Sequence, residues 1–305
     1  MERVADQRGS RKGQKLSQPV IIVGAPRSGT NILRDVLTSV SGFETWPCDE
    51  INLVWKHHNR SIPHDELDPT HARPEVTEYL RGVFNKLSRK TQPTHVVEKT
   101  CATSLRVGFA AAVFPEAKFV FIRRDGLDAA ASTIQRWDAP FDARYIARKL
   151  RYAPKSDLPF YATQFLAKRR ASRQAERAGR TSGARRVDSW WGPKPHDYVE
   201  LQHQHSLDEL AIVQWQRCVE ASVQDLATLP QGQVHEVVYE SFAQDPATTM
   251  RGILDFLESE RSVPDDVLAS VSPHSIGKGR TSFDTSTTQR LTDLASKTLS
   301  LLGYA

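Results

Sequence analysis

Long apolar runs are missing from this sequence of 305 residues. No stretch approaches the roughly 18 consecutive apolar residues that a membrane-spanning helix needs, so we expect no membrane span. The first residues, MERVADQRGSRKGQKLSQ, are basic and polar and have no apolar centre. This composition argues against a signal peptide or a membrane anchor, and we therefore expect a cytoplasmic protein.

Cysteine is also scarce. The three cysteines, Cys48, Cys101 and Cys218, lie far apart and form neither a C-x-x-C pair nor a zinc-ligand spacing. An odd number of isolated thiols indicates a reducing compartment and no disulfide framework.

Metal-ligand patterns are missing as well. Two histidine pairs, His57 with His58 and His203 with His205, are too close in sequence and lack a carboxylate pattern typical of a metal site. We interpret them as structural or surface residues and expect no metal.

The remaining composition is that of a soluble globular protein. Hydrophobic residues make up 39% and charged residues 25% of the chain, and the net charge is +5. This mild excess suits an anionic ligand better than a nucleic acid, which we do not expect as a partner. We predict a flexible basic tail over residues 1–18 and a single domain over 19–305.

Apolar strand-like segments alternate with helical periodicity along most of the chain. Strands are predicted over 19–25, 94–100, 118–124 and 234–242. Helices are predicted after the first strand and over 104–114, 125–137, 205–229, 246–259 and about 287–301. Such alternation is typical of an α/β fold with a central parallel sheet flanked by helices.

Two regions interrupt this rhythm. Residues 51–94 contain several prolines and histidines and are predicted to form loops and short helices. Residues 148–194 form an insertion or lid with an Arg-rich stretch at 168–186, which is either a solvated helix or a gate for an anionic acceptor. Trp190 and Trp191 either stack on a sugar or aromatic acceptor or pack in the core.

The stretch GAPRSGTN, residues 24–31, follows the first strand and opens a helix. Backbone N–H groups at a helix start favour a bound anion, and two glycines allow the backbone to bend. The common triphosphate loop has lysine where Thr30 stands, whereas here the positive charge lies at Arg27. A magnesium-triphosphate kinase is therefore less favoured, and a tight turn without a ligand remains an alternative.

A second motif, FVFIRRDGLDAAAS, brings Arg124 to the carboxyl end of a strand, where open α/β sheets bind ligands. Ser132 follows eight residues later, inside the next helix, where its hydroxyl can reach the same anion. The alternative is an Arg–Asp surface pair followed by a packing helix.

Together the two motifs resemble the cofactor signatures of sulfotransferases that use 3′-phosphoadenosine 5′-phosphosulfate (PAPS). The cofactor half, including VEKTCATSLRVGFAAAVFPEAKFVFIRRDGLDAAASTI, is most similar to tyrosylprotein sulfotransferases. The resemblance covers about 19–50, 95–137 and 234–283. It implies a sulfotransferase fold with a P-loop-like phosphate-binding loop, and transfer of a sulfuryl group from PAPS to a hydroxyl or amine, which releases adenosine 3′,5′-bisphosphate.

The resemblance also implies roles for individual residues. The residues matching the 5′-phosphosulfate loop are Arg27, Ser28, Gly29, Thr30 and Asn31. The 3′-phosphate pair is Arg124 and Ser132, Tyr239 matches a residue near the adenine, and Lys278, Gly279 and Arg280 match the loop that closes over the nucleotide. Arg27 and Lys99 are expected to stabilise the leaving group.

A carboxylate after the first helix is implied as the general base. Glu50 is preferred over its neighbour Asp49, and Glu98 and His95 are weaker rivals. The alternative is that Asp49 and Glu50 are two solvated acids at a strand start. A nucleotide-dependent small-molecule kinase and a non-catalytic anion-binding module remain alternative functions. The acceptor, anionic or carbohydrate among other classes, is not identified by these residues.

Overall fold

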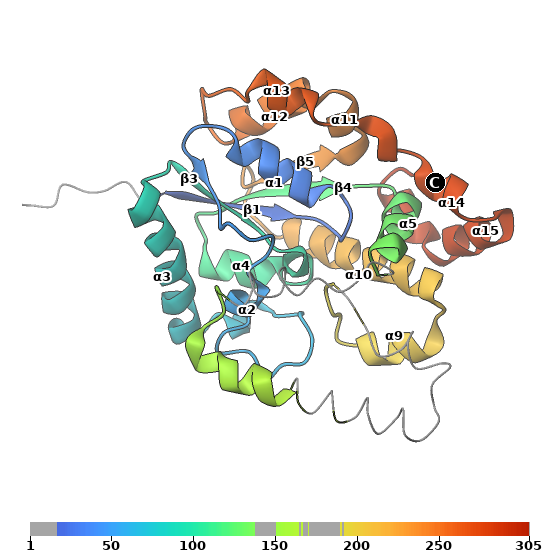
Figure 1. Cartoon of the computed structure of the whole chain (residues 1–305), viewed down its shortest axis with the longest axis horizontal. Coiled ribbons are helices and arrows are strands. Elements are labelled where there is room, and N and C mark those ends of the chain that lie inside the picture. Colours follow the sequence, from blue (N-terminus) through green and yellow to red (C-terminus); the bar gives the residue numbers. More distant parts are fainter. Residues whose placement is uncertain are drawn as a thin grey trace, which may run out of the picture.

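The computed structural model describes residues 17–137, 151–164, 166, 170, 190 and 192–304 (Figure 1). Predictions for residues 1–16, for nearly all of the Arg-rich stretch 168–186 and for Trp191 fall outside these residues. The first strand begins at Gln18, so the boundary that we drew for the tail was wrong there.

A five-stranded sheet forms the centre of the molecule, with the strand order β2-β3-β1-β4-β5 and all neighbours parallel. The strands are β1 (Gln18–Val23), β2 (Phe43–Glu44), β3 (His95–Lys99), β4 (Lys118–Arg123) and β5 (Val234–Val238). The predicted fold class is therefore confirmed. Because parallel strands share one direction, the residues that follow β1, β3, β4 and β5 meet at a single edge of the sheet.

Each face of the sheet is covered by helices because successive side chains of a buried strand point to opposite faces. Val20 and Ile22 belong to one core cluster and Ile21 and Val23 to another. Helices of the first cluster are α1 (Thr30–Thr38), α11 (Tyr239–Gln244) and α12 (Pro246–Phe256). Helices of the second are α2 (Asn52–Trp55), α3 (Pro74–Thr91) and α4 (Val107–Val113). Figure 1 shows α1, α11 and α12 above the sheet and α2, α3 and α4 below it.

A third core cluster lies at the carboxyl ends of the strands, toward which the arrowheads of β1, β4 and β5 point in Figure 1. It joins α5 (Gly126–Trp137), α10 (Leu207–Leu226), α15 (Thr285–Leu294) and α16 (Ser296–Leu301). The short helix α13 (Asp265–Ala269) packs against the first core cluster, whereas α9 (Tyr198–Gln204) and α14 (Lys278–Ser282) lie beside the third. The other helices of the third cluster fix α5, and with it the second motif, against the end of the sheet.

Several predicted elements differ from the structure. The region 51–94 contains the long helix α3, which begins with Pro74 and buries Val76, Leu80 and Phe84 at helical spacing. The predicted strand 234–242 ends at Val238, and Tyr239 begins α11. The expected loop 275–283 contains α14, and the last helix is divided into α15 and α16.

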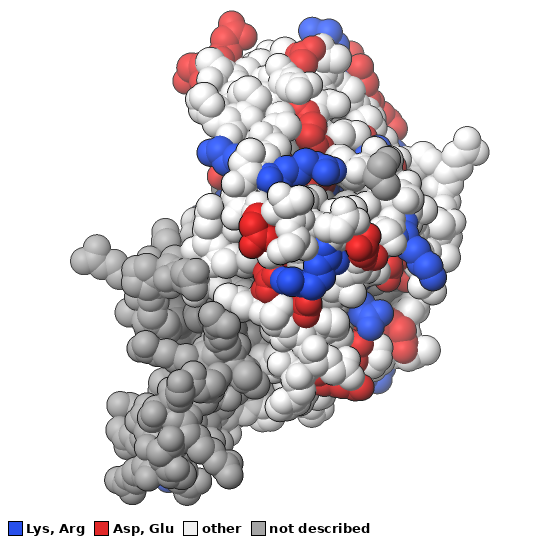
Figure 2. Space-filling model, turned by 90° about the vertical axis from the view of Figure 1, so that its right-hand side faces the viewer, with Lys and Arg blue, Asp and Glu red and all other residues white. Residues whose placement is uncertain are grey.

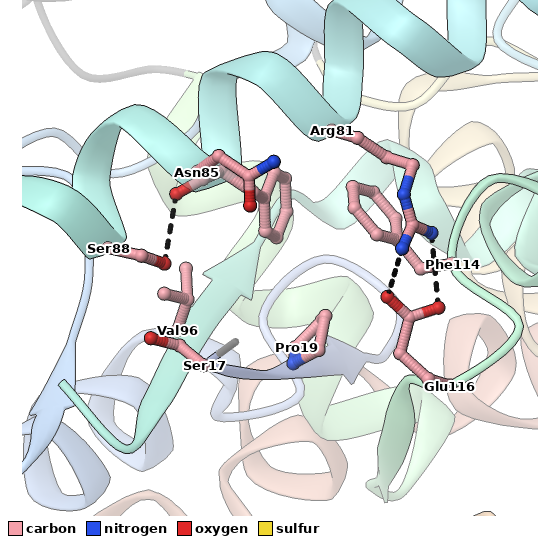
Figure 3. Close-up of a pocket in the computed structure, with 9 residues that line it drawn as sticks. Ser17, Pro19, Arg81, Asn85, Ser88, Val96, Phe114 and Glu116 are labelled. Carbon is pink, nitrogen blue, oxygen red and sulfur yellow. Dashed lines mark hydrogen bonds and ion pairs between the residues drawn. The ribbon is translucent and has the colours of Figure 1, made fainter. Parts of the chain in front are cut away.

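The opposite edge of the sheet carries a small hollow (Figure 3). Ser17, Pro19 and Val96 line it from the amino ends of β1 and β3, and α3 borders it. The ion pair between Arg81 and Glu116, 2.7 Å apart, closes one side of this hollow. The hollow therefore lies away from the edge of the sheet to which the two motifs contribute.

On the face shown in Figure 2, basic and acidic side chains of the described residues are interspersed. Among the described residues, Arg290 on α15 forms ion pairs with both Asp208 and Glu209. The basic excess of the sequence is thus not gathered on this face. None of the helices in the described part of the chain has the length and apolarity that crossing a membrane requires.

Candidate active site

The loop between β1 and α1 forms a tight turn that only glycine can complete at its last position. Gly29 has a φ of 89°, a left-handed conformation that glycine adopts without strain. A Cβ there would lie 2.3 Å from the Tyr239 ring, so any side chain would displace the tyrosine. No side chain caps the helix that follows, α1, whose first-turn amides lack partners within the helix.

The hydroxyl of Ser28 in this loop is fully buried and has no hydrogen-bond partner among the described atoms. Arg27 has a φ of 66° and an exposed side chain. An uncapped helix start, an unpaired buried hydroxyl and an exposed cation fit an anion-binding loop.

Both sequence motifs meet in space. The Nε of Arg27 donates to the hydroxyl of Ser132 on α5, at 2.9 Å. Since β1 and β4 are neighbours in the sheet, the loop after β1 and the helix after β4 start side by side. The cation of the first motif and the hydroxyl of the second can therefore face one ligand.

Arg124 is buried and makes contacts that its sequence position does not indicate. Its two terminal nitrogens donate to backbone carbonyls, one to Arg27 at 2.8 Å and one to Ser275 at 2.7 Å. Its guanidinium stacks over the Tyr239 ring at 4.4 Å, whereas its Nε is buried without a partner. The arginine thus ties the loop after β1 to the segment around Ser275.

Tyr239 lies between these segments. Its ring packs against Gly29 and Arg124, and its hydroxyl lies 2.6 Å from the Ser275 hydroxyl. Only 7% of the residue is exposed. The tyrosine predicted near the adenine is therefore a packing element of the site as well.

The segment 275–280 packs on the start of α5. Lys278 and Arg280 are exposed, and Arg280 lies 3.9 Å from the carboxylate of Asp125. Gly279 is buried against α5. The structure therefore brings the predicted closing loop beside Arg124 and Ser132.

Lys99 and Glu50 form an ion pair at the carboxyl end of β3. The ammonium lies 3.3 Å from the Glu50 carboxylate, whose same oxygen accepts the backbone N–H of Cys101 at 3.2 Å. Burial alone lowers the pKa of Lys99, but the charge of Glu50 raises it, and the net pKa lies above its ordinary value. Lys99 thus stays a cation at neutral pH.

This pair adjoins the loop after β1. The Thr30 hydroxyl lies 3.7 Å from the Cys101 thiol, which connects the start of α1 to the residue whose amide holds Glu50. Burial is the main cause that raises the pKa of the Cys101 thiol to about 11, so the thiol stays protonated at neutral pH. Asn31 is exposed in the first turn of α1.

The other candidates for the general base have contacts away from the Lys99 ammonium. Asp49 lies 3.8 Å from Arg34 on α1 rather than beside Lys99. Glu98 is buried and accepts from the Thr100 hydroxyl at 2.5 Å; burial raises its pKa. His95 is at the opposite end of β3, stacked on Phe43.

The paired histidines also have structural contacts. His57 lies 2.8 Å from Asp157, a carboxylate that sequence spacing could not associate with it. His205 lies 3.5 Å from Glu209 one helical turn away. Within the described ranges, no group of three or more His, Cys, Asp or Glu side chains is arranged to hold a metal ion.

Trp190, the described member of the tryptophan pair, packs in the core. Its indole N–H donates to the carbonyl of Pro193 at 2.8 Å, and its ring meets Tyr198 edge-on. It also lies against the third core cluster. Of the two interpretations of this residue, core packing is therefore the one that its contacts favour.

Sequence reasoning overlooked three residues of this site: Thr100, Asp128 and Ser275. The Thr100 hydroxyl accepts the backbone N–H of Ile51 at 3.1 Å and so holds the chain next to Glu50. Asp128 and Ser275 make the contacts between α5, Arg124 and the segment 275–280. Only the position of Asp128 within the second motif was a signal that could have drawn attention to it.

Comparison with known proteins bears on this arrangement. A sequence profile described as the sulfotransferase family matches residues 19–180 and 174–263. The chain belongs to the sulfotransferase family. Both motifs and the Lys99–Glu50 pair lie within the matched ranges.

Solved sulfotransferase structures share the fold. A sulfotransferase domain from the curacin biosynthetic pathway has a TM-score of 0.52 and 13% identity, over 92% of this chain and 98% of that chain. A sulfotransferase domain from the Synechococcus PCC 7002 olefin synthase has a TM-score of 0.52 and 14% identity, over 94% and 97%. At these identities the likeness concerns the fold alone.

One curated relative is an uncharacterized protein from Aquifex aeolicus (strain VF5), 25% identical over 159 residues. The match covers 46% of this chain but only 21% of that protein. The chain thus matches about a fifth of this relative's length. The finer resemblance to tyrosylprotein sulfotransferases stays a prediction.

Proposed function

We propose that this protein transfers the sulfuryl group of PAPS to a hydroxyl or amine acceptor and releases adenosine 3′,5′-bisphosphate. The observation that carries the proposal is the Lys99–Glu50 pair, 3.3 Å apart, beside a glycine-containing loop whose Arg27 contacts Ser132. A cation, a carboxylate and an anion-binding loop are the groups that sulfuryl transfer requires. Membership of the sulfotransferase family supports the same reaction class.

The bound co-substrate would supply the sulfuryl group and a phosphate leaving group. Arg27, Ser28 and the amides at the start of α1 would bind its 5′ end, and Lys99 would balance the charge that grows on the bridging oxygen. Glu50 would accept the acceptor's proton while the new S–O or S–N bond forms and the bond to the phosphate oxygen breaks. Arg124, Ser132 and the segment 275–280 would surround the second phosphate.

The pairing of Glu50 with Lys99 suits this division of roles. A neighbouring ammonium favours the charged form of a carboxylate, which is the form that accepts a proton. Asp49 also lies near a cation, but that cation is Arg34 on α1 and not Lys99. These contacts favour Glu50 over Asp49 as the proposed base.

We expect adenosine 3′,5′-bisphosphate to stabilise the protein against heat more than AMP or Mg-ATP does at equal concentration. A ligand that binds only the folded state contributes about 2.7 kcal/mol when present at about 100 times its Kd. A melting curve with each ligand measures the order directly. Strongest stabilisation by Mg-ATP would favour the kinase, whereas bisphosphate binding without transfer to any hydroxyl or amine would favour the non-catalytic module.

We expect Arg124→Ala to weaken binding of adenosine 3′,5′-bisphosphate by about ten- to hundredfold, because a charge-assisted hydrogen bond contributes about 1.5–3 kcal/mol. Binding of AMP should change little, because AMP lacks the 3′-phosphate. Calorimetric titration of both ligands into both proteins is the measurement.

The adjacent arginine provides a matched control. Arg123 points to the other face and donates to Glu236 and to the carbonyl of Leu302. Arg123→Ala should therefore leave the ratio of the two affinities unchanged. Equal losses for both ligands in Arg124→Ala would show instead that Arg124 serves only to hold the backbone carbonyls of Arg27 and Ser275.

A further inference from the structure

Asp128, on the first turn of α5, joins two separate parts of the candidate site. One carboxylate oxygen accepts the backbone N–H of Gly277 at 2.8 Å, and the other accepts the N–H of Gly279 at 2.6 Å. Arg124 lies 3.5 Å from the same carboxylate. Both oxygens are thus engaged by the segment 275–280, and the cation neutralises their charge.

The carboxylate is shielded from water. Asp128 is 3% exposed, so its hydrogen bonds to the two amides are made away from competing solvent. Charge-assisted hydrogen bonds are about twice as strong as neutral ones. The buried carboxylate of Asp128 therefore holds the segment 275–280 in one position.

The backbone of the segment touches α5 directly. A Cβ on Gly279 would lie 2.3 Å from the carbonyl carbon of Leu127 and 2.4 Å from the backbone nitrogen of Asp128. Real side chains do not approach a backbone so closely, so glycine is required for the carboxylate to reach both amides. Asp128 and Gly279 thus form one joint, the contact that fixes the segment 275–280 to the start of α5.

The same segment is also fastened on its other side. Arg124 donates to the Ser275 carbonyl, and the hydroxyls of Tyr239 and Ser275 lie 2.6 Å apart. Two cations, Lys278 and Arg280, project from the fastened segment and are exposed. The joint therefore fixes where these two cations stand relative to Arg124 and Ser132.

We propose that Asp128 is a positioning residue for recognition of the second phosphate of adenosine 3′,5′-bisphosphate. This role rests on the proposed function. It requires no contact between Asp128 and the ligand. The acid holds the segment 275–280 so that its cations complete a phosphate site with Arg124 and Ser132. Loss of the joint should reduce discrimination between the bisphosphate and AMP without affecting the 5′ site.

The test is calorimetric titration of adenosine 3′,5′-bisphosphate and AMP into the wild type and three variants. Asp128→Asn removes the charge and offers an N–H where an acceptor is needed. Gly279→Ala breaks the same joint by steric contact and leaves every charge in place. Asp284→Asn is the matched control, because Asp284 is an exposed acid that caps α15 and bonds Thr287.

We expect Asp128→Asn and Gly279→Ala each to weaken bisphosphate binding by about tenfold or more, the equivalent of one charge-assisted hydrogen bond. AMP binding should stay within about twofold of the wild type in all proteins, because AMP lacks the 3′-phosphate that the segment 275–280 is proposed to bind. Asp284→Asn should behave as the wild type with both ligands.

Three outcomes would overturn the proposal. Equal losses for both ligands would make Asp128 a general support of the fold, and unchanged affinities for both ligands in both variants would remove it from recognition. Tighter bisphosphate binding in Asp128→Asn would identify the carboxylate as a repelling charge. If the wild type itself does not prefer the bisphosphate over AMP, the proposed function fails instead, so the two failures are distinguishable.

Discussion

Glu50→Gln should lower the rate of sulfuryl transfer by about 10²–10⁴ while leaving nucleotide binding intact, because general base catalysis is typically of this size. Glutamine has nearly the shape of glutamate and can still accept the Cys101 amide through its oxygen. What it lacks is the charge that accepts a proton from the acceptor. The release of adenosine 3′,5′-bisphosphate from PAPS in the presence of an acceptor measures the rate, and calorimetry measures the binding.

Asp49→Asn is the matched control for this substitution. Asp49 is adjacent in sequence and has the same charge, but it faces Arg34 on α1. We expect its variant to retain most of the activity. If Asp49→Asn abolishes transfer and Glu50→Gln does not, the base is Asp49; if neither variant is slowed, the proton leaves by another route and the assignment of Glu50 is wrong.

Lys99→Ala should slow transfer by about 10²–10³ and weaken nucleotide binding far less, as expected when one preorganised charge stabiliser is removed. The reason is its position at the carboxyl end of β3, buried and held as a cation by Glu50. Charge develops on the leaving oxygen mainly in the transition state, so the loss should appear in kcat rather than in the Kd of the nucleotide.

Lys99→Ala removes both the buried aliphatic stem of the side chain and its charge, and a second variant separates these two losses. Lys99→Met keeps the buried aliphatic stem and removes only the charge. Unchanged turnover in both variants would contradict the role proposed for Lys99.

Local sequence patterns were sufficient to predict the framework of the site. Continuous apolar runs before GAPRSGTN and within FVFIRRDGLDAAAS indicate buried parallel strands, and the structure has β1 and β4 there. The helical periodicity that follows each run predicts α1 and α5. These inferences succeed because strand and helix periods are properties of neighbouring residues.

Contacts between residues far apart in the sequence could not be predicted from local patterns and are seen only in the tertiary structure. Arg27 and Ser132 are 105 residues apart, and they meet only because β1 lies between β3 and β4 in the sheet. The resemblance favoured Glu50 over Asp49, and the contacts of Ile51 and Glu50 with the residues after β3 decide which of the two acids reaches Lys99.

The joint between Asp128 and the segment 275–280 also separates what local sequence patterns predict from what only the tertiary structure shows. A periodic pattern indicates that residue 128 begins a helix, but its partners Gly277 and Gly279 lie about 150 residues away and were predicted only as part of a loop. Their amides reach the carboxylate because α5 and α14 are pressed together where glycine permits backbone contact. Sequence alone thus determined β1, β3, β4 and β5, the helices that follow the two motifs, and the motifs that we propose to bind anions. The order of the strands and the close approach of distant backbone segments, which no local period encodes, decided which side chains form the site.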